Sequence, residues 1–212
     1  LMYWPSTSKD ADFFFEYVDA PILDADTVLA KYTDWKDTSN WPESSRCKGL
    51  RRKDAEKQGD PLAKTGLIGA FCRTYTIQDA IATFLPDAYT ECSTPGRYTY
   101  VNGSTAAGLV VYEDKFAYSN HATDPISGQL CNAFDLVRIH KFGEADLEAK
   151  EGTPVNKLPS WGKMMELAGS DENVRQTIGE EKLQRAKEDF GEEFQTTDDT
   201  AWLKKLKTNK AG

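Results

Sequence analysis

Eight basic residues between positions 46 and 73 are the side chains that most readily suggest chemistry in this sequence. They are Arg46, Lys48, Arg51, Arg52, Lys53, Lys57, Lys64 and Arg73. By count, residues 38–73 carry a net charge of +4, although the whole chain carries −8. Lysine and arginine neutralise phosphates without reading base sequence. The pattern predicts either a local phosphate-binding surface or a solvated basic linker, and composition alone leaves both open.

The acidic balance of the rest of the chain excludes a protein that coats nucleic acid with its whole surface. Four tyrosines could add to a local surface, because aromatic rings stack on unpaired bases. They are Tyr98, Tyr100, Tyr112 and Tyr118. Tyrosines on a small sheet more often pack against a helix, and we expect these to lie in the core.

A second candidate group is His121, Asp124 and Cys131, whose side chains could bind a metal ion. Their spacing matches no common site, and a histidine followed by Thr-Asp-Pro is more typical of a turn. We therefore expect His121 and Asp124 to hydrogen-bond a turn, with no metal and no other cofactor. The sequence has no phosphate loop, no GxGxxG and no GxSxG, so we expect no catalytic residues.

The four cysteines are far apart and form no CxxC pair, a pattern that indicates free thiols in a reducing cytoplasm. There is no secretory signal and no apolar run near the ~20 residues of a membrane span. We expect a cytoplasmic protein with no membrane partner. Leu1 is not an initiator and the first residues read as strand or core, so we expect a fragment.

The elements that would position these residues are clearest between positions 97 and 143. Asn102-Gly103 favours a tight turn, and the apolar, β-branched residues 109–112 favour a strand. Asn132 can cap a helix that ends at Gly143. The predicted fold class is α+β: a small antiparallel β-meander packed with helices, followed by a mostly helical C-terminal tail.

The flanking segments carry further signals. Thr76, with Asp79 three residues on, predicts the start of a helix that Pro86 ends. Residues 44–64 show no apolar period and predict an exposed, partly flexible basic loop. Residues 1–23 fit a hairpin or two short strands, with Asp24 or Asp26 capping a short helix after them. In the tail, Ser160, Ser170 and Thr197 can each cap a helix.

Several stretches of the sequence resemble one family closely. They are residues 66–75 (GLIGAFCRTY), 96–100 (GRYTY), 103–112 (GSTAAGLVVY), 114–119 (DKFAYS), 121–125 (HATDP) and 131–138 (CNAFDLVR). The family is the large replication proteins of phages and prophages, labelled virulence-associated protein E or phage primase–helicase. Residues 1–6 are similar to the end of its primase–polymerase-like part, and residues 202–206 with 209–210 to the lead-in to its P-loop ATPase part.

The resemblance implies that the chain is the connecting region of a DNA replication protein. The primase-like metal motifs would then lie before Leu1 and the Walker motifs after Gly212, so the parent would be the enzyme. It implies five segments. They are the end of the primase-like domain (1–43), the basic loop (44–65), an α+β middle module (66–143), a linker (144–159) and a helical lead-in to the ATPase domain (160–212). Paired histidines are usual in the family where this chain has Asn120-His121, and no catalytic motif of the family falls within these residues.

The function expected from these observations is a non-catalytic module that positions single-stranded or primer–template DNA by phosphate contacts. Its other partners would be the primase-like and ATPase domains of the same chain. The alternative is a structural spacer or protein-docking module with no nucleic-acid contact.

Overall fold

A computed structural model of the chain describes residues 7–14, 16–17 and 19–190. The chain divides into two compact units, residues 1–35 and residues 36–212. In the first unit, the described residues form one short helix, α1 (Ala25–Leu29). Asp24 caps it by accepting a hydrogen bond from the Thr27 N–H at 3.0 Å, which confirms that prediction. The hairpin predicted for residues 1–23 is wrong for the part that is described, because no strand forms there and Phe13 and Phe14 are exposed.

The second unit is built on a five-stranded antiparallel sheet in which every strand pairs with the next in sequence. The strands are β1 (Tyr89–Glu91), β2 (Arg97–Tyr100), β3 (Leu109–Tyr112), β4 (Phe116–Ser119) and β5 (Leu130–Cys131). The predicted α+β meander is therefore confirmed. The two outer strands, β1 and β5, are too short to show a period of two, so the sequence did not reveal them.

The β3–β4 turn shows how local residues set the register. Glu113 and Asp114 have φ of 51° and 54°, and the Lys115 N–H donates to the Tyr112 carbonyl at 3.0 Å. Positive φ at both central residues gives a mirror-image turn, whose twist matches that of a hairpin. The same turn also satisfies the start of the helix at residues 77–84. The Asp114 carbonyl and carboxylate accept hydrogen bonds from the N–H groups of Ile77 and Gln78.

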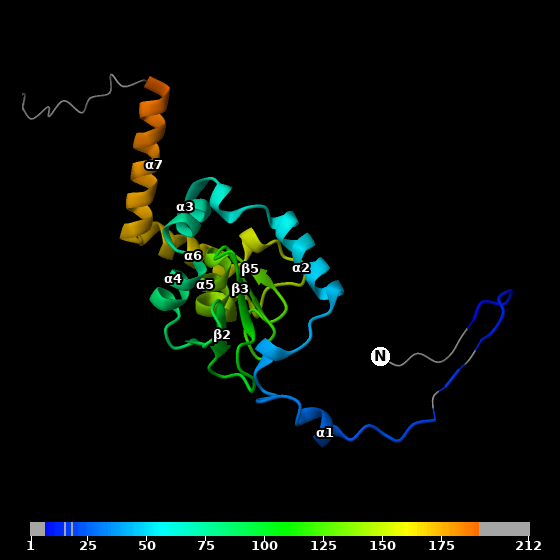
Figure 1. Ribbon diagram of the computed structural model, residues 1–212. Coiled ribbons are helices and arrows are strands. Elements are labelled where there is room, and N and C mark those ends of the chain that lie inside the picture. The colour runs from blue at the N-terminus through cyan, green and yellow to red at the C-terminus, as the bar shows by residue number, and fades with distance from the viewer. Residues whose placement is uncertain (1–6, 15, 18, 191–212) are drawn as a thin grey trace, which may run out of the picture. The chain divides into compact units, whose positions relative to one another are not determined.

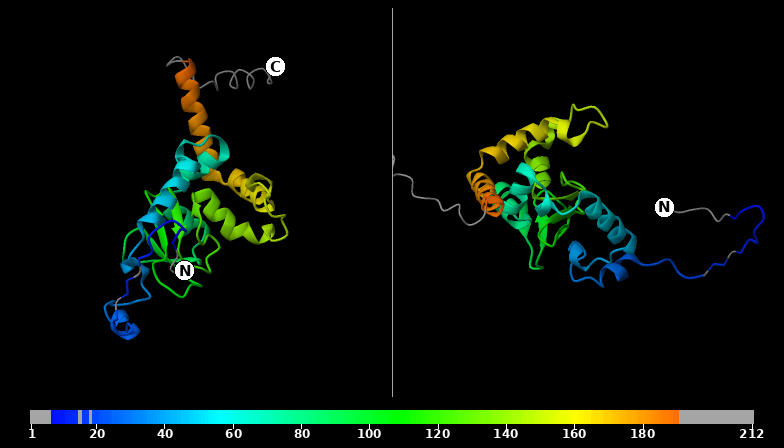
Figure 2. Two further views of the ribbon diagram at one scale, coloured as in Figure 1. Left: turned by 90° about the vertical axis from the view of Figure 1, so that its right-hand side faces the viewer. Right: turned by 90° about the horizontal axis from the view of Figure 1, so that it is seen from above.

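Helices cover one side of the sheet, and one helix lies on the other (Figures 1 and 2). The covering helices are α3 (Gly66–Thr74), α4 (Ile77–Phe84), α5 (Ala133–Phe142) and α6 (Pro159–Ser170). The long helix α7 (Glu172–Phe190) packs on α3 and α6. Phe71 of α3, Phe134 of α5 and Met164 of α6 are fully buried in the core that these helices share. The ring of Phe134 contacts those of Phe71 and Trp161 edge-on, at 5.8 and 5.3 Å between centroids.

Two of the predicted helix starts, at Thr76 and at Asn132, are correct. Thr76 and Asp79 form a capping box on α4, and Asn132 accepts from the Asp135 N–H at 2.9 Å on α5. In the tail the predicted caps are wrong. Helix α6 starts at Pro159, a residue suited to the first turn because it lacks an N–H. On α7, Asp171 rather than Ser170 accepts from the Val174 N–H. The helix predicted at Thr197 lies outside the described residues.

The basic segment differs most from its prediction. It is not a flexible loop, because residues 45–58 form the helix α2 (Ser45–Gln58). Ser44 caps it by accepting from the Arg46 N–H at 3.2 Å, and most of its residues are strong helix formers. It shows no apolar period because only Arg51 on it is buried. The described residues also contain four short 3₁₀ turns: η1 (Thr38–Asn40), η2 (Pro61–Ala63), η3 (Gly143–Asp146) and η4 (Val155–Lys157).

Candidate nucleic-acid interface

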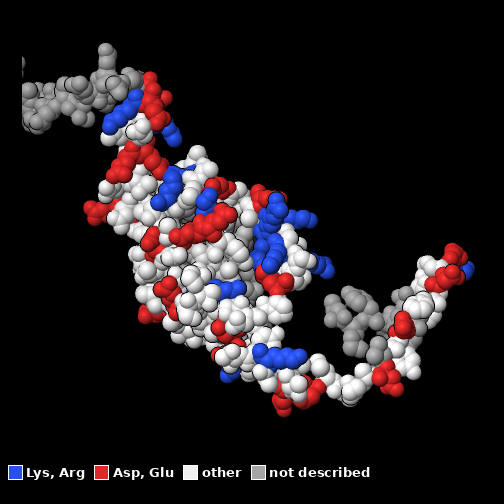
Figure 3. Space-filling model, viewed as in Figure 1, with Lys and Arg blue, Asp and Glu red and all other residues white. Residues whose placement is uncertain are grey.

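Helix α2 carries six of the eight predicted phosphate-binding residues, with only two acids, Asp54 and Glu56. Figure 3 shows the resulting group of Lys and Arg side chains over α2, on a surface where acids are common elsewhere. Two of these cations are well exposed, with 66% of the Lys48 side chain and 84% of the Arg52 side chain open to solvent. A preformed helix fixes the backbone positions from which these cations extend, so binding a ligand there costs less backbone entropy than binding it on a flexible loop.

Arg51 differs from the other α2 cations because it faces the protein. The residue is 8% exposed, and its guanidinium forms an ion pair with Glu43. It also lies over the rings of Tyr112 and Tyr118, at 5.8 and 5.0 Å from their centroids. Cation–π contact and ion pairing together anchor α2 on the sheet. Arg51 therefore has a structural role in addition to the phosphate contact predicted for it, which stays a prediction.

The sheet surface beneath α2 follows from the strand register. Arg97 pairs with Val110, Val110 with Tyr118, and Tyr118 with Leu130, so these side chains share one face. Tyr112 and Phe116 pair on the same face at the β3–β4 turn. Tyr98 and Tyr100 belong to the opposite, helix-covered face, as predicted. Tyr112 and Tyr118 do not, and only tertiary structure could separate the two pairs.

A cavity of about 530 Å³ opens between α2 and this outer face. Lys48, Arg51 and Arg52 come to it from α2, and Arg97 comes from β2. Its apolar wall contains Val110, Tyr112, Phe116 and Leu130. Burial raises the pKa of the Tyr112 phenol, although nearby Arg51 works against the shift. The structure thus brings three of the predicted cations to one aromatic-lined hollow, and adds Arg97, which no local motif had indicated.

A second cavity of about 440 Å³ adjoins it, with Glu43, Arg97 and Val110 on both walls. His121 lines this second hollow. The His121 Nε2 accepts from the Tyr100 N–H at 3.3 Å, which leaves Nδ1 to donate to the Thr105 hydroxyl at 2.9 Å. A Cβ on Gly108 would lie 2.5 Å from Nε2, so glycine is required there for the ring to fit. Burial lowers the pKa of His121, with Asp124 opposing the shift.

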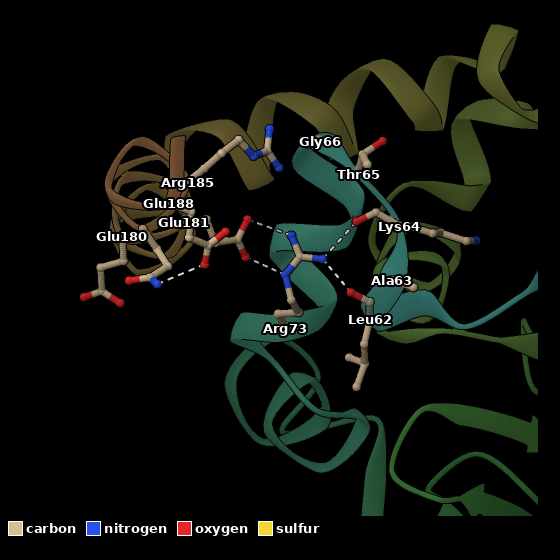
Figure 4. Close-up of a pocket in the computed structure, with 11 residues that line it drawn as sticks. Leu62, Ala63, Lys64, Thr65, Gly66, Arg73, Glu180, Glu181, Arg185 and Glu188 are labelled. Carbon is tan, nitrogen blue, oxygen red and sulfur yellow. Dashed lines mark hydrogen bonds and ion pairs between the residues drawn. The ribbon is translucent and has the colours of Figure 1, made fainter. Parts of the chain in front are cut away.

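Lys64 and Arg73 lie apart from α2, in a hollow of about 720 Å³ between α7 and the start of α3 (Figure 4). The Arg73 guanidinium donates to both carboxylate oxygens of Glu181, at 2.5 and 2.8 Å. It also donates to the carbonyls of Leu62 and Lys64, at 2.6 and 2.8 Å. Arg73 therefore ties α3 to α7 and to the preceding loop, and the structure does not bring it together with the α2 cations.

The residues singled out as a metal candidate have other partners. His121 and Asp124 shape their turn as predicted, through the Asp124 N–H to His121 carbonyl and Ile126 N–H to Asp124 carboxylate bonds. Cys131 is buried in the sheet, and burial raises the pKa of its thiol. Among the described residues, no three histidine, cysteine or acidic side chains converge as a metal site.

Sequence reasoning missed a buried polar network around Asp124. The Tyr89 hydroxyl donates to the Asp124 carboxylate at 2.9 Å and lies 2.7 Å from His140 Nε2. Burial opposes ionisation of Asp124, but hydrogen bonds from His140, Ser119, the Ile126 N–H and Tyr89 outweigh it and lower its pKa. Burial and the Asp124 charge raise the pKa of Tyr89 strongly. The network is closed to solvent, so its role is to fasten β1, the β4–β5 loop and α5 together; its members are too far apart in sequence to give a local signal.

Comparison with known proteins relates the start of the chain to one family model. Residues 1–44 match the family model VapE_N, the VapE N-terminal domain. No curated protein matches, and no solved structure matches. The matched stretch supports a relation to VapE-type proteins and includes Ser44, the cap of α2. No helix among the described residues has the length and apolar character needed to cross a bilayer.

Proposed function

We propose that this chain is a non-catalytic, DNA-binding module in the connecting region of a VapE-type DNA replication protein. Helix α2 would hold the backbone of a template or primer strand, beside a primase-like domain and a P-loop ATPase domain of the same protein. The observation that carries the proposal is the exposed row of α2 cations beside an aromatic-lined hollow. The VapE match at residues 1–44 supports the replication setting.

The contacts within α2 are consistent with backbone binding rather than with a purely structural helix. Arg52 pairs with Glu56 at 3.2 Å, but 84% of its side chain stays exposed. Ion pairs this exposed contribute little stability, so a phosphate can replace the carboxylate at low cost. Lys53 and Lys57 are also exposed. Phosphate contacts of this kind give affinity without base sequence preference and a strong dependence on salt.

A salt titration tests the proposal directly. We expect the chain to bind a labelled single-stranded DNA oligonucleotide with a negative slope of log affinity against log salt. Changing Lys48, Arg52 and Lys53 to Glu should reduce that slope by about 2, because each phosphate that a single strand presents to a cation contributes roughly 0.7 to it. Arg51 is left unchanged because its loss would disturb the anchoring of α2.

A charge-matched control distinguishes binding by the α2 cations from an effect of the net charge of the chain. Lys157, Lys163 and Lys182 are exposed on η4, α6 and α7, and changing these three to Glu alters the net charge equally. The control should bind DNA nearly as the unchanged chain does. Equal losses in both triple variants would show that only net charge matters, and the proposal for α2 would be wrong.

A structural spacer or protein-docking module is the second candidate. It is favoured by the internal use of the basic residues: Arg51 pairs with Glu43, and Arg73 pairs with Glu181. Footprinting of a replication substrate with the full-length protein separates the two functions. If bound DNA protects the α2 lysines from a chemical modifying reagent, the binding module is supported. If their reactivity is the same with and without DNA, the spacer is supported.

A further inference from the structure

The cavity of about 530 Å³ beneath α2 combines features that phosphate binding alone does not use. Its floor is the outer face of β3 and β4, with an aromatic pair, Tyr112 and Phe116, held side by side by the strand register. Its rim carries exposed cations on α2. Hollows of roughly 300–1,000 Å³ with mostly apolar walls and a few polar groups are typical of small-ligand sites.

We propose that this cavity receives the base of one unpaired nucleotide, while Lys48 and Arg52 hold the phosphate of that nucleotide. The inference rests on the proposed function and adds a preference that backbone contacts cannot give. A base inside a duplex is stacked and paired, so it cannot enter a hollow under a helix unless it leaves the stack. The module would therefore distinguish single strands from duplexes.

The aromatic floor is suited to stacking against a base. Bases stack on aromatic side chains in proteins that bind single strands, and the contact tolerates any base because each has a π-face. Arg51 lies over the rings of both Tyr118 and Tyr112, at 5.0 and 5.8 Å, but Tyr112 and Phe116 line the cavity and Tyr118 does not. Those two rings are half-buried, so they are accessible from the cavity and still held in place by the sheet.

The position of the exposed cations indicates which end of the nucleotide enters the cavity. Two carboxylates, those of Glu43 and Glu113, also line the cavity. Glu43 offsets the charge of Arg51, with which it pairs, and the exposed Glu113 carboxylate can accept a hydrogen bond from the amino group of a base. Lys48 and Arg52 are largely exposed at the rim. The exposed α2 cations are therefore placed to hold the phosphate, while the aromatic and apolar wall receives the base.

The test fills the cavity without changing any charge. Ala55 is a half-buried α2 residue on the cavity wall, and Ala55→Leu adds apolar volume there with little change in helix propensity. Ala82→Leu on α4 is the matched control, because Ala82 is an exposed helical alanine outside the cavity. Phe116→Leu is a second variant that removes the ring but keeps most of the apolar volume. Each is measured against labelled single-stranded DNA, the same sequence as RNA, and a blunt DNA duplex, with melting curves as a check of folding.

The unchanged chain should bind single-stranded DNA more tightly than the duplex. Ala55→Leu and Phe116→Leu should each weaken single-strand binding by about tenfold, as expected when one base no longer stacks on an aromatic ring, and leave duplex binding and the salt slope unchanged. Ala82→Leu should change neither. An RNA strand that binds as well, and binds more weakly to the same two variants, would support the cavity site and identify RNA as a second source of the nucleotide.

Three outcomes overturn the inference, and they are distinguishable. If Ala55→Leu and Phe116→Leu bind single strands as the unchanged chain does, the cavity takes no base, although α2 remains a backbone-binding helix. If they weaken single-strand and duplex binding equally, the cavity gives no preference for unpaired bases. If the unchanged chain binds neither strand nor duplex at low salt, the proposed function fails and the base site fails with it.

Discussion

At the scale of single residues, several ionisable side chains form hydrogen bonds and ion pairs within the protein. Arg51 stands between Glu43 and two tyrosine rings, and Arg73 donates four hydrogen bonds within the protein. Both belong to the set that composition predicts to bind phosphate. Charge in a sequence shows that a cation is present, but burial and partners decide whether it is available, and neither can be read from the composition.

His121 gives a prediction for stability against pH. Its folded pKa lies below the unfolded value of about 6.5, because burial disfavours the imidazolium. The unfolded chain therefore binds more protons than the folded chain at acidic pH. The contribution of neutral His121 to the free energy of unfolding is fully present above about pH 6.5 and is lost as pH falls through the folded pKa. We expect the urea midpoint to drop between about pH 7 and about pH 5. His121→Asn should be less stable at neutral pH, but its urea midpoint should change much less with pH. If the midpoint of the variant falls with pH as that of the unchanged chain does, another group causes the pH dependence.

At the scale of elements, two glycines in neighbouring helices should respond oppositely to alanine. A Cβ on Gly69 of α3 would lie 1.6 Å from the Lys64 carbonyl oxygen, so Gly69→Ala must displace the preceding loop. Gly49 of α2 has nothing within 4 Å of such a Cβ. Gly49→Ala should stabilise the protein by up to about 1 kcal/mol, since glycine is a poor helix former.

Chemical denaturation measures both changes. Gly69→Ala should cost about 1–3 kcal/mol or more, as overpacking against backbone does. Equal stability of the two variants would mean that α3 does not approach residue 64 as closely as the structure shows.

The pair Arg73 and Glu181 offers an element-scale test of what Arg73 does. Arg73→Glu places two acids together and should loosen α7 from α3, which limited proteolysis within α7 would detect. The swap Arg73→Glu with Glu181→Arg should restore protection, because the ion pair is re-formed with opposite polarity. DNA affinity should be nearly unchanged throughout. A large loss of affinity that the swap does not recover would instead place Arg73 at a phosphate.

At the scale of the whole molecule, residues 36–212 form the larger compact unit, and the described side chains before Ala25 are mostly exposed. Ile22, for example, is 98% exposed and Phe14 is 81% exposed. We expect removal of residues 1–23 to leave the thermal midpoint and the DNA salt slope nearly unchanged, because the side chains described in this segment are exposed. A clear drop in the midpoint would show that this segment packs on the rest of the chain.

The sequence by itself determined the elements whose signals are local. The meander, the capping box at Thr76, the cap at Asn132 and the short helix after Asp24 all depend on residues within a few positions of each other, so propensity and hydrogen bonding suffice to predict them. The same local reasoning failed for α2, because a helix that buries almost nothing shows no apolar period.

Only the tertiary structure decided which of the candidate residues share a site. Lys48 and Arg52 meet Phe116 and Arg97 because α2 lies across the outer face of the sheet, and Tyr112 separates from Tyr98 because β2 and β3 present them on opposite faces. Tyr89, Asp124 and His140 likewise meet across β1, a loop and α5. These contacts join residues from 16 to more than 60 positions apart, and chain folding rather than local preference brings such residues together.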